Sequence, residues 1–279
     1  MTNADQQEFW TSAAGPRWVA LQAEMDALLG PVLDAVMTRA ALIAGARVLD
    51  VGCGTGDSVA RIADAVGATG HVTGADISQT MLQQARDQLG HLPQVTLTLA
   101  DVQSHQFETP FDAILSRFGV MFFDDTVAAF ANLWATLAPG GHVVMAAWGP
   151  APDNPWFMEP ASAARAVLGP MPKVDRTLPG PFAFEDADRV VAMMQAAGMA
   201  APAVETLYMD LTPTGTVEEA AALCCDIGPA DSALKYFDAS DQDRAAVRDA
   251  IAARFAPFDG PEGLRIPACI HLFEARKPS

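Results

Sequence analysis

The chain has few cysteines, and their positions fit neither a metal site nor a disulfide framework. Its 279 residues include four cysteines: Cys53, Cys224, Cys225 and Cys269. Zinc motifs pair cysteines about two to four residues apart, and disulfide-rich proteins carry a dense, even set. We therefore expect no metal and no disulfide, and a reducing cytoplasm is the simplest location.

Long apolar runs are also missing. No uninterrupted apolar stretch reaches the ~18 residues of a membrane-spanning helix. The segment Met1–Glu8 is polar and acidic, so it does not resemble a signal peptide or a transit peptide. These features predict a protein without a membrane partner.

Basic residues are scarce. The sequence contains 17 lysines and arginines against 34 aspartates and glutamates, a net charge of −17. Nucleic acids and anionic membranes both require a basic surface, so neither is an expected partner. The simplest explanation for the many acidic residues is solubility. A preference for neutral or cationic substrates is an alternative that the charge permits.

Apolar residues, in contrast, are plentiful enough for a sizeable core. They make up 51% of the chain, which is typical of a globular protein. A length of 279 residues allows one large domain, or one domain with a cap.

The strongest local pattern is Arg47–Gly56, which reads Arg-Val-Leu-Asp-Val-Gly-Cys-Gly-Thr-Gly. Its first half is a short apolar run typical of a buried strand, and Ser58–Val66 follows with helical spacing. A strand, a glycine turn and a helix form a cradle for a nucleotide-like ligand. Glycine lets the backbone approach the ligand, and the helix N-terminus offers unpaired N–H groups.

The glycine spacing discriminates between cofactors. Dinucleotide-binding folds use Gly-x-Gly-x-x-Gly, but here the glycines run Gly-x-Gly-x-Gly and Asp57 stands where the third dinucleotide glycine belongs. A carboxylate there would repel a pyrophosphate. Asp50, just before the turn, suits a ligand with a cationic amino group.

This turn is similar to motif I of the class I S-adenosylmethionine-dependent methyltransferases. Four further matches follow in order: an acid at the end of the second strand, Asp76; an acid and a small apolar residue after the third, Asp101-Val102; the strand end Ser116-Arg117; and Leu-x-Pro-Gly-Gly at 137–141. The chain resembles the ubiquinone/menaquinone-biosynthesis-like type of this family over roughly residues 10–150. The resemblance implies an α/β fold: a doubly wound, Rossmann-like sheet of seven strands, the last antiparallel, with helical cap and lid insertions.

S-adenosylmethionine is the cofactor that this resemblance implies. The acid at 76 would bind the ribose hydroxyls, and the acid at 101 would accept from the adenine amine. The cofactor-binding residues carried over are Gly52, Gly54, Asp76, Ile77, Asp101, Val102 and Ser116. Trp18 and Gln22 are added as residues that close over the cofactor, although Gln22 could instead be a satisfied polar group in a packed interface.

The chain divides into three parts by its pattern. Residues 1–45 form an N-terminal helical cap with a kink or break at Gly30-Pro31, and residues 46–150 form the cofactor-binding core. Residues 151–279 complete the sheet and add a helical lid that forms the substrate pocket. Within this last part, Gly149–Pro160 carries four prolines and predicts a loop, with a helix fragment over Ser162–Leu168. Further helices are expected over 185–197, 217–227 and 240–255, and strands over 204–211 and 266–275.

The sequence does not identify a catalytic residue. Methyl transfer from a sulfonium is an in-line displacement that depends mainly on alignment, and a general base is needed only if the acceptor loses a proton. The histidines at 105, 142 and 271 and Tyr208 are better explained by solvated or structural roles. Arg117 and Trp148 are expected to line the substrate pocket, although Arg117 could instead form a salt bridge at the sheet edge.

The lid sequence predicts a small, apolar or aromatic methyl acceptor. Its aromatic and methionine residues carry this expectation, although half of them could belong to the core: Trp156, Phe157, Met158, Met171, Phe182, Phe184, Met193 and Met194. The expected assembly is a monomer or a homodimer. Two rival functions stay open: a non-catalytic or regulatory S-adenosylmethionine-binding module, and a nicotinamide-dependent oxidoreductase.

Overall fold

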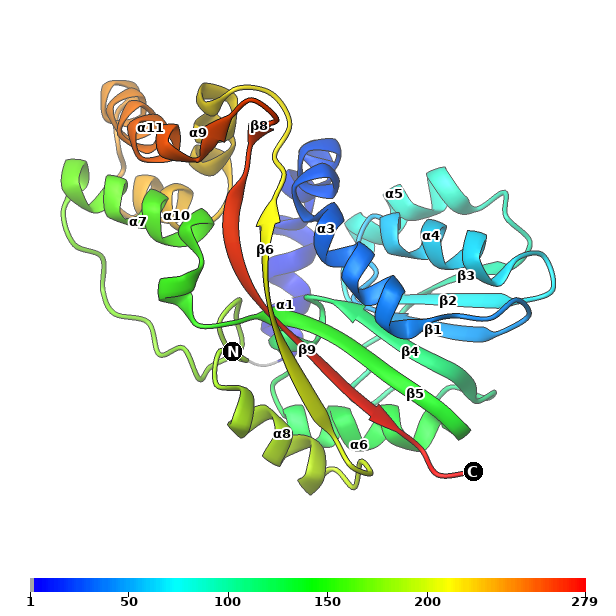
Figure 1. Cartoon of the computed structure of the whole chain (residues 1–279). Helices are drawn as coiled ribbons and strands as arrows, with labels where there is room; N and C mark the ends of the chain where they lie inside the picture. The colour runs from blue at the N-terminus through cyan, green and yellow to red at the C-terminus, as the bar shows by residue number, and fades with distance from the viewer. Residues whose placement is uncertain (1–2) are drawn as a thin grey trace.

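A seven-stranded sheet runs through the molecule in the order β3-β2-β1-β4-β5-β9-β6 (Figure 1). The computed structural model describes residues 3–279, so the first two residues of the Met1–Glu8 segment lie outside the described residues. The strands of the sheet are β1 (Arg47–Val51), β2 (His71–Asp76), β3 (Val95–Leu99), β4 (Phe111–Arg117), β5 (Leu137–Trp148), β6 (Ala203–Leu211) and β9 (Ile266–Arg276).

Strand direction follows the sequence prediction. The pairs from β3 through β5 are parallel, and β9 is antiparallel to both of its neighbours, β5 and β6. Val48, Leu49 and Val51 of β1 are almost completely buried, as expected for a strand covered on both faces. The doubly wound sheet with an antiparallel last strand is therefore confirmed.

Helices cover both faces of this sheet. On one face lie α3 (Gln22–Ala40), α4 (Asp57–Val66) and α5 (Gln79–Leu89), and on the other α6 (Thr126–Thr136) and α8 (Ala187–Ala196) (Figure 1). The apolar positions of α4 recur at helical spacing and are fully buried against β1 and β2: Val59, Ile62, Ala63 and Val66. Ser78 caps α5 and Asp125 caps α6, each by accepting a backbone N–H.

The N-terminal segment covers the edge where the parallel strands end. It consists of α1 (Asn3–Glu8), η1 (Phe9–Ala13) and α2 (Gly15–Ala20). Its backbone carbonyls at Trp10 and Thr11 accept hydrogen bonds from the Ser78 and Thr80 hydroxyls, both at 2.7 Å. The start of α5 therefore holds this segment in place.

A second group of helices, named the lid helices below, lies at the upper left of Figure 1. It contains α7 (Pro155–Leu168), α9 (Val217–Asp226), α10 (Pro229–Tyr236) and α11 (Asp241–Phe255), which pack on one another. Short elements complete the chain: η2 (Val120–Phe122), η3 (Ala151–Asp153), η4 (Ala256–Phe258) and a hairpin of β7 (Asp259–Gly260) and β8 (Gly263–Leu264). Helix α10 has no counterpart among the sequence predictions.

Of the two alternatives expected at Gly30-Pro31, a kink or a break, the break is wrong. Helix α3 continues through Pro31, and the break falls earlier, at Leu21, between α2 and α3. Proline lacks the N–H that would bond the carbonyl four residues before it, here Ala27. The Thr212 hydroxyl donates to that carbonyl at 3.3 Å, so a residue far along the chain supplies the missing bond.

The loop predicted over Gly149–Pro160 is also wrong in its second half. Helix α7 begins at Pro155, seven residues before the predicted fragment at Ser162. Pro155 occupies the first turn, where an N–H would have no helical partner and proline is tolerated. The number of prolines therefore led to an overestimate of the length of the loop.

Two features are absent from residues 3–279. None of the helices there has both the length and the apolarity to cross a bilayer. Nor does this part of the chain group three or more histidine, cysteine or acidic side chains in a way that could hold a metal ion.

Candidate active site

The turn after β1 has a backbone that only glycine adopts easily. Gly52, Gly54 and Gly56 have φ angles of +70°, +56° and +99°. A Cβ atom on Gly52 would lie 2.6 Å from the Cα of Gly119, so there is no space for a side chain. The turn presents bare backbone to the space at the sheet edge and leads directly into α4.

Asp76, at the end of β2, is tied to this turn. One carboxylate oxygen accepts the Gly54 N–H at 2.8 Å, and the other accepts the Ser78 N–H at 2.7 Å. The side chain is buried, and this burial raises the pKa of Asp76 despite the opposing effect of the backbone hydrogen bonds. Because each oxygen can accept a second bond, the carboxylate can still bind two hydroxyls.

Asp101 follows β3 and is held from the N-terminal segment. The Asn3 amide donates to one of its oxygens at 2.8 Å, and the Gln103 N–H donates to the other at 3.0 Å. The Asp101 carboxylate therefore accepts a hydrogen bond from an NH2 group, the same kind of donor as the amine of adenine.

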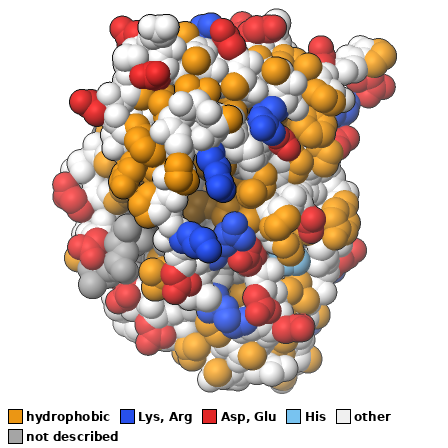
Figure 2. Space-filling view, turned by 90° about the vertical axis from the view of Figure 1, so that its left-hand side faces the viewer, with side chains coloured by type: hydrophobic (Ala, Val, Ile, Leu, Met, Phe, Trp, Pro, Cys, Tyr) orange, Lys and Arg blue, Asp and Glu red, His pale blue; other side chains and the backbone are white. Residues whose placement is uncertain are grey.

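These groups open onto one cavity of about 1000 Å³ between the sheet edge, the N-terminal segment and the lid. Figure 2 shows a hollow with apolar walls on one face of the molecule. The predicted site residues that line the cavity are Trp18, Gly52, Gly54, Asp76, Ile77, Asp101, Val102, Arg117 and Trp148. The structure thus brings together nine residues from six separate segments of the sequence.

Two predicted cofactor residues do not line this cavity. The Gln22 amide exchanges hydrogen bonds with Gln84 and Gln88 of α5 at 2.9–3.2 Å, which matches the alternative of a packed polar interface. The Ser116 hydroxyl is fully buried, donates to the Val51 carbonyl at 2.8 Å and accepts the Gly119 N–H at 3.1 Å. Ser116 therefore supports the glycine turn from behind.

Arg117 both lines the cavity and forms ion pairs. It lies 3.0 Å from Asp57 and 3.4 Å from Asp26, with little of its side chain exposed. Burial raises the pKa of Asp26, and Asp57 raises it further, while Arg117 opposes both effects. Arg117 therefore forms the salt bridges that were one alternative, and it also lines the cavity.

Aromatic rings connect the sheet edge to the lid. Phe118 stacks on Trp148 at 4.3 Å, Phe157 meets Trp148 edge-on at 4.9 Å, and Phe182 meets Phe157 edge-on at 4.9 Å. All four rings line the cavity. Phe118 has a φ of +66°, a strained value for a non-glycine residue, of the kind that accumulates at functional sites.

The aromatic and methionine residues of the lid divide between cavity and core. Those that line the cavity are Trp156, Phe157, Met171 and Phe182, whereas Phe184 and Met194 are buried in the core. Sequence reasoning missed Phe118, because a backbone turned into the left-handed region leaves no signal in the residue type.

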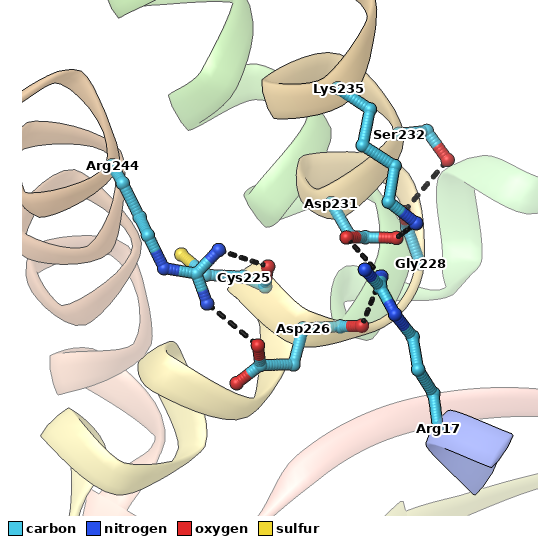
Figure 3. A network of polar contacts seen from close by, with 8 residues as sticks. All are labelled: Arg17, Cys225, Asp226, Gly228, Asp231, Ser232, Lys235 and Arg244. Atoms are coloured by element: carbon cyan, nitrogen blue, oxygen red, sulfur yellow. Dashed lines mark hydrogen bonds and ion pairs between the residues drawn. The ribbon is translucent and has the colours of Figure 1, made fainter. Parts of the chain in front are cut away.

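Arg17 and α10 were also missed. Arg17 forms an ion pair with Asp231 and donates to the Asp226 carbonyl at 3.1 Å, and Lys235 lies 2.7 Å from the same Asp231 carboxylate (Figure 3). Arg17, Asp231 and Lys235 all line the cavity. Arg17 stands next to the predicted Trp18, but nothing in the sequence indicated its partner more than 200 residues away.

The histidines considered as bases have structural surroundings. His142 bonds the Ala40 carbonyl at 2.9 Å, and His271 bonds the Thr206 hydroxyl at 2.9 Å; burial lowers the pKa of both. His105 packs edge-on against Phe107, and Tyr208 is exposed on β6. None of these four side chains is among the described residues that line the cavity.

Asp50 is enclosed behind the turn. It is 1% exposed, accepts the Ser58 hydroxyl and does not line the cavity within the described part of the chain. Burial raises the pKa of Asp50 from 3.8 to about 6. The expectation that it meets a cationic amino group directly finds no support in this geometry.

Comparison with known proteins identifies this arrangement. Residues 48–141 match a family model described as a methyltransferase domain. The chain is also similar to demethylmenaquinone methyltransferase of Staphylococcus aureus, with 38% identity over 101 residues. Both matches fall on the part of the chain that resembles the class I S-adenosylmethionine-dependent methyltransferases. The curated match covers 36% of this chain and 42% of that enzyme, so it spans less than half of either.

Several solved structures have a similar fold over nearly the whole chain, at low sequence identity. Haemonchus contortus phosphoethanolamine N-methyltransferase 2, solved with S-adenosylhomocysteine, has a TM-score of 0.54 and 18% identity over 89% of this chain and 53% of that one. The cyclase SpnF has a TM-score of 0.53 and 18% identity, over 95% of this chain and 96% of the SpnF chain. The resemblance to class I methyltransferases predicted from the sequence is confirmed, and S-adenosylmethionine is the cofactor of this family.

Proposed function

We propose that the chain is an S-adenosylmethionine-dependent methyltransferase that acts on a small, apolar or aromatic acceptor. The observation that carries the proposal is the shared cavity. It joins the glycine turn, Asp76 and Asp101 at one end to the rings of Trp148 and Phe157 at the other. At about 1000 Å³ it reaches the upper end of the ~300–1000 Å³ of small-molecule sites, which leaves space for a cofactor and an acceptor.

The cofactor end has the donors and acceptors that an adenosyl group requires. In the proposal, Asp76 accepts from the ribose hydroxyls and Asp101 from the adenine amine, with Ile77 and Val102 against the ring. Gly52 and Gly54 let the backbone approach, and Trp18 covers this end from α2. Bound here, S-adenosylmethionine supplies a methyl group on a sulfonium.

The protein's contribution to the reaction is alignment and the exclusion of water. Both accelerate an in-line displacement without a protein nucleophile. No histidine, tyrosine or glutamate is present among the described residues that line the cavity, so we assign no general base. Lid helices α7 and α10 on one side and the N-terminal segment on the other enclose the reacting groups.

The nature of the acceptor is supported by the aromatic wall. Phe118, Trp148, Phe157 and Phe182 offer flat apolar surfaces on which a planar molecule can stack. The curated relative acts, by its name, on demethylmenaquinone, which is an apolar ring compound. Both observations favour an acceptor of this class.

Two other functions were considered, a nicotinamide-dependent oxidoreductase and a module without methyl transfer. A nicotinamide-dependent enzyme would need Gly-x-Gly-x-x-Gly, and this chain has Asp57 at the position of the third glycine. A module without methyl transfer stays open as the second candidate, because SpnF shares the fold and is named as a cyclase.

Several companion expectations belong to the same proposal. Residues 1–45 act as a cap, 46–150 as the cofactor core and 151–279 as the lid and substrate part. The protein works in the cytoplasm without nucleic acid or membrane partners, as a monomer or homodimer. Its four cysteines are all buried and unpaired, in agreement with a reducing compartment.

A turnover assay tests the proposal. The purified protein is incubated with methyl-tritiated S-adenosylmethionine and a panel of phenols, quinols and aromatic amines, and organic-extractable label is counted. The proposal predicts transfer to at least one aromatic acceptor, reduced strongly in Asp76→Ala and unchanged in Asp249→Ala, an exposed carboxylate of α11. Tight cofactor binding without transfer to any acceptor favours the non-catalytic module.

A further inference from the structure

The mouth of the cavity carries a concentration of positive charge that the whole chain lacks. Five cationic side chains line the cavity away from the strand ends, namely Arg17, Arg165, Lys173, Arg176 and Lys235. Two carboxylates, Asp226 and Asp231, accompany them. The chain as a whole has twice as many acids as bases, at 34 against 17, so this local excess reverses the global sign. Figure 2 shows the Lys and Arg side chains gathered around the hollow.

Three of these cations already have partners in the protein. Arg17 and Lys235 share Asp231, and Arg176 lies 3.4 Å from Glu185 and over the ring of Phe182. Their charge is therefore partly neutralised before any ligand arrives.

Arg165 and Lys173 have no such partner. Within residues 3–279, neither makes an ion pair or a side-chain hydrogen bond, although both line the cavity. Arg165 lies on α7, and Lys173 on the segment between α7 and α8. In a protein with this many carboxylates, two cations that remain unpaired at the entrance to an apolar cavity are available for a ligand.

These two cations belong to the lid side of the cavity. The glycine turn, Asp76 and Asp101 come from strands β1 to β3, whereas Arg165 and Lys173 come from the part of the chain that follows β5. The aromatic chain from Phe118 to Phe182 connects the two sides. A molecule that stacks on these rings can therefore direct a charged group toward the lid.

We propose that the methyl acceptor is amphiphilic, with an aromatic or apolar body and an anionic carboxylate or phosphate group that Arg165 and Lys173 bind at the cavity mouth. This inference rests on the proposed function, because it takes the cavity to be the acceptor site. Attraction between unit charges strengthens as water is displaced from the cavity, so an anion gains more here than on an open surface. Because acidic residues outnumber basic ones in the chain as a whole, an anion is attracted to the cavity mouth more than to the rest of the surface.

The test uses protein saturated with S-adenosylhomocysteine and three probes of one shape: 2-naphthoate, 2-naphthyl phosphate and the neutral 2-naphthamide. Calorimetric titration gives an affinity for each. We expect the anions to bind about five- to tenfold more tightly than the amide, as two partly exposed ion pairs would give. The ratio between naphthoate and naphthyl phosphate indicates which anionic group the site prefers.

Paired variants assign the effect to these residues. In Arg165→Gln/Lys173→Gln the preference for anions should disappear, with the affinity for the amide unchanged. The control, Arg248→Gln/Arg265→Gln, removes two charges from exposed pairs that do not line the described cavity, and should keep the preference. Higher ionic strength should weaken binding of the anions and spare the amide.

Failure of the proposed function and failure of the anionic acceptor give different results. If S-adenosylhomocysteine fails to bind, the proposed function fails. If it binds and the three probes show equal affinity, or none, the anionic acceptor is wrong. If the double variant weakens S-adenosylhomocysteine in place of the anion preference, the two cations serve the cofactor's own carboxylate and the inference is overturned.

Discussion

The backbones of Gly52 and Gly119 meet so closely that a Cβ atom on Gly52 would lie 2.6 Å from the Gly119 Cα. A Cβ on Gly119 would lie 2.4 Å from the Val51 carbonyl oxygen. The Ser116 hydroxyl holds the two segments together by bonding both the Val51 carbonyl and the Gly119 N–H. The end of β4 therefore fixes the shape of the glycine turn after β1.

Gly119→Ala should damage both stability and cofactor binding. The new methyl group must displace backbone atoms, and such overpacking costs roughly 1–3 kcal/mol. Urea denaturation measures the loss, and titration with S-adenosylhomocysteine measures the displaced turn. Gly260→Ala is the matched control, because nothing lies within 4 Å of its new Cβ. Equal stability of the two variants would contradict the close contact described above.

Asp50 should make the stability of the protein depend on pH. Its pKa is about 6 in the folded protein and 3.8 when unfolded, so the folded state holds the proton more tightly. The free energy of unfolding that Asp50 contributes is complete below pH 4 and is lost as pH rises to about 6. The shift corresponds to about 3 kcal/mol.

Asp50→Asn removes this titration while an amide oxygen can still accept from Ser58. We expect the variant to gain stability relative to the natural protein as pH rises from 4 to 7, and the difference to level off above about pH 6. Urea midpoints across this pH range measure the gain. Parallel stability curves for the two proteins would show that the buried carboxylate does not titrate as described.

Arg17→Gln should loosen the lid without unfolding the protein. The side chain links α2 to α10 through Asp231 and to the end of α9 through the Asp226 carbonyl (Figure 3). Because Arg17 is 41% exposed, its loss should cost no more than about 1 kcal/mol of global stability. Amide hydrogen exchange over residues 226–236 should nevertheless become faster. Arg248→Gln, whose partner Asp249 is its neighbour in sequence, should leave exchange in that segment unchanged.

The sequence predicted the features that local pattern determines. The strand at 47–51, the glycine turn and the acids at strand ends each depend on a few neighbouring residues. Parallel strands that end at one edge then place Asp76 and Asp101 together. The fold, the resemblance to a family and the nine predicted site residues that line the cavity followed from these signals.

Features that depend on distant contacts were missed. Pro31 does not break α3 because Thr212 bonds the freed carbonyl, and Ser116 faces the turn's backbone and not the cavity. The acidity of the whole chain left neutral or cationic substrates open. The positive mouth became visible only when α2, α7, α10 and the segment after α7 came together around one cavity.

The most direct test of the account is calorimetric titration with S-adenosylhomocysteine and, separately, with NADH. We predict micromolar binding of the first alone, lost in Asp76→Ala and kept in Asp249→Ala. Circular dichroism must show that Asp76→Ala stays folded, and Asp76→Asn, which keeps one acceptor, should bind with intermediate affinity. Binding of NADH alone, or undiminished binding of S-adenosylhomocysteine by folded Asp76→Ala, would contradict the cofactor site described here.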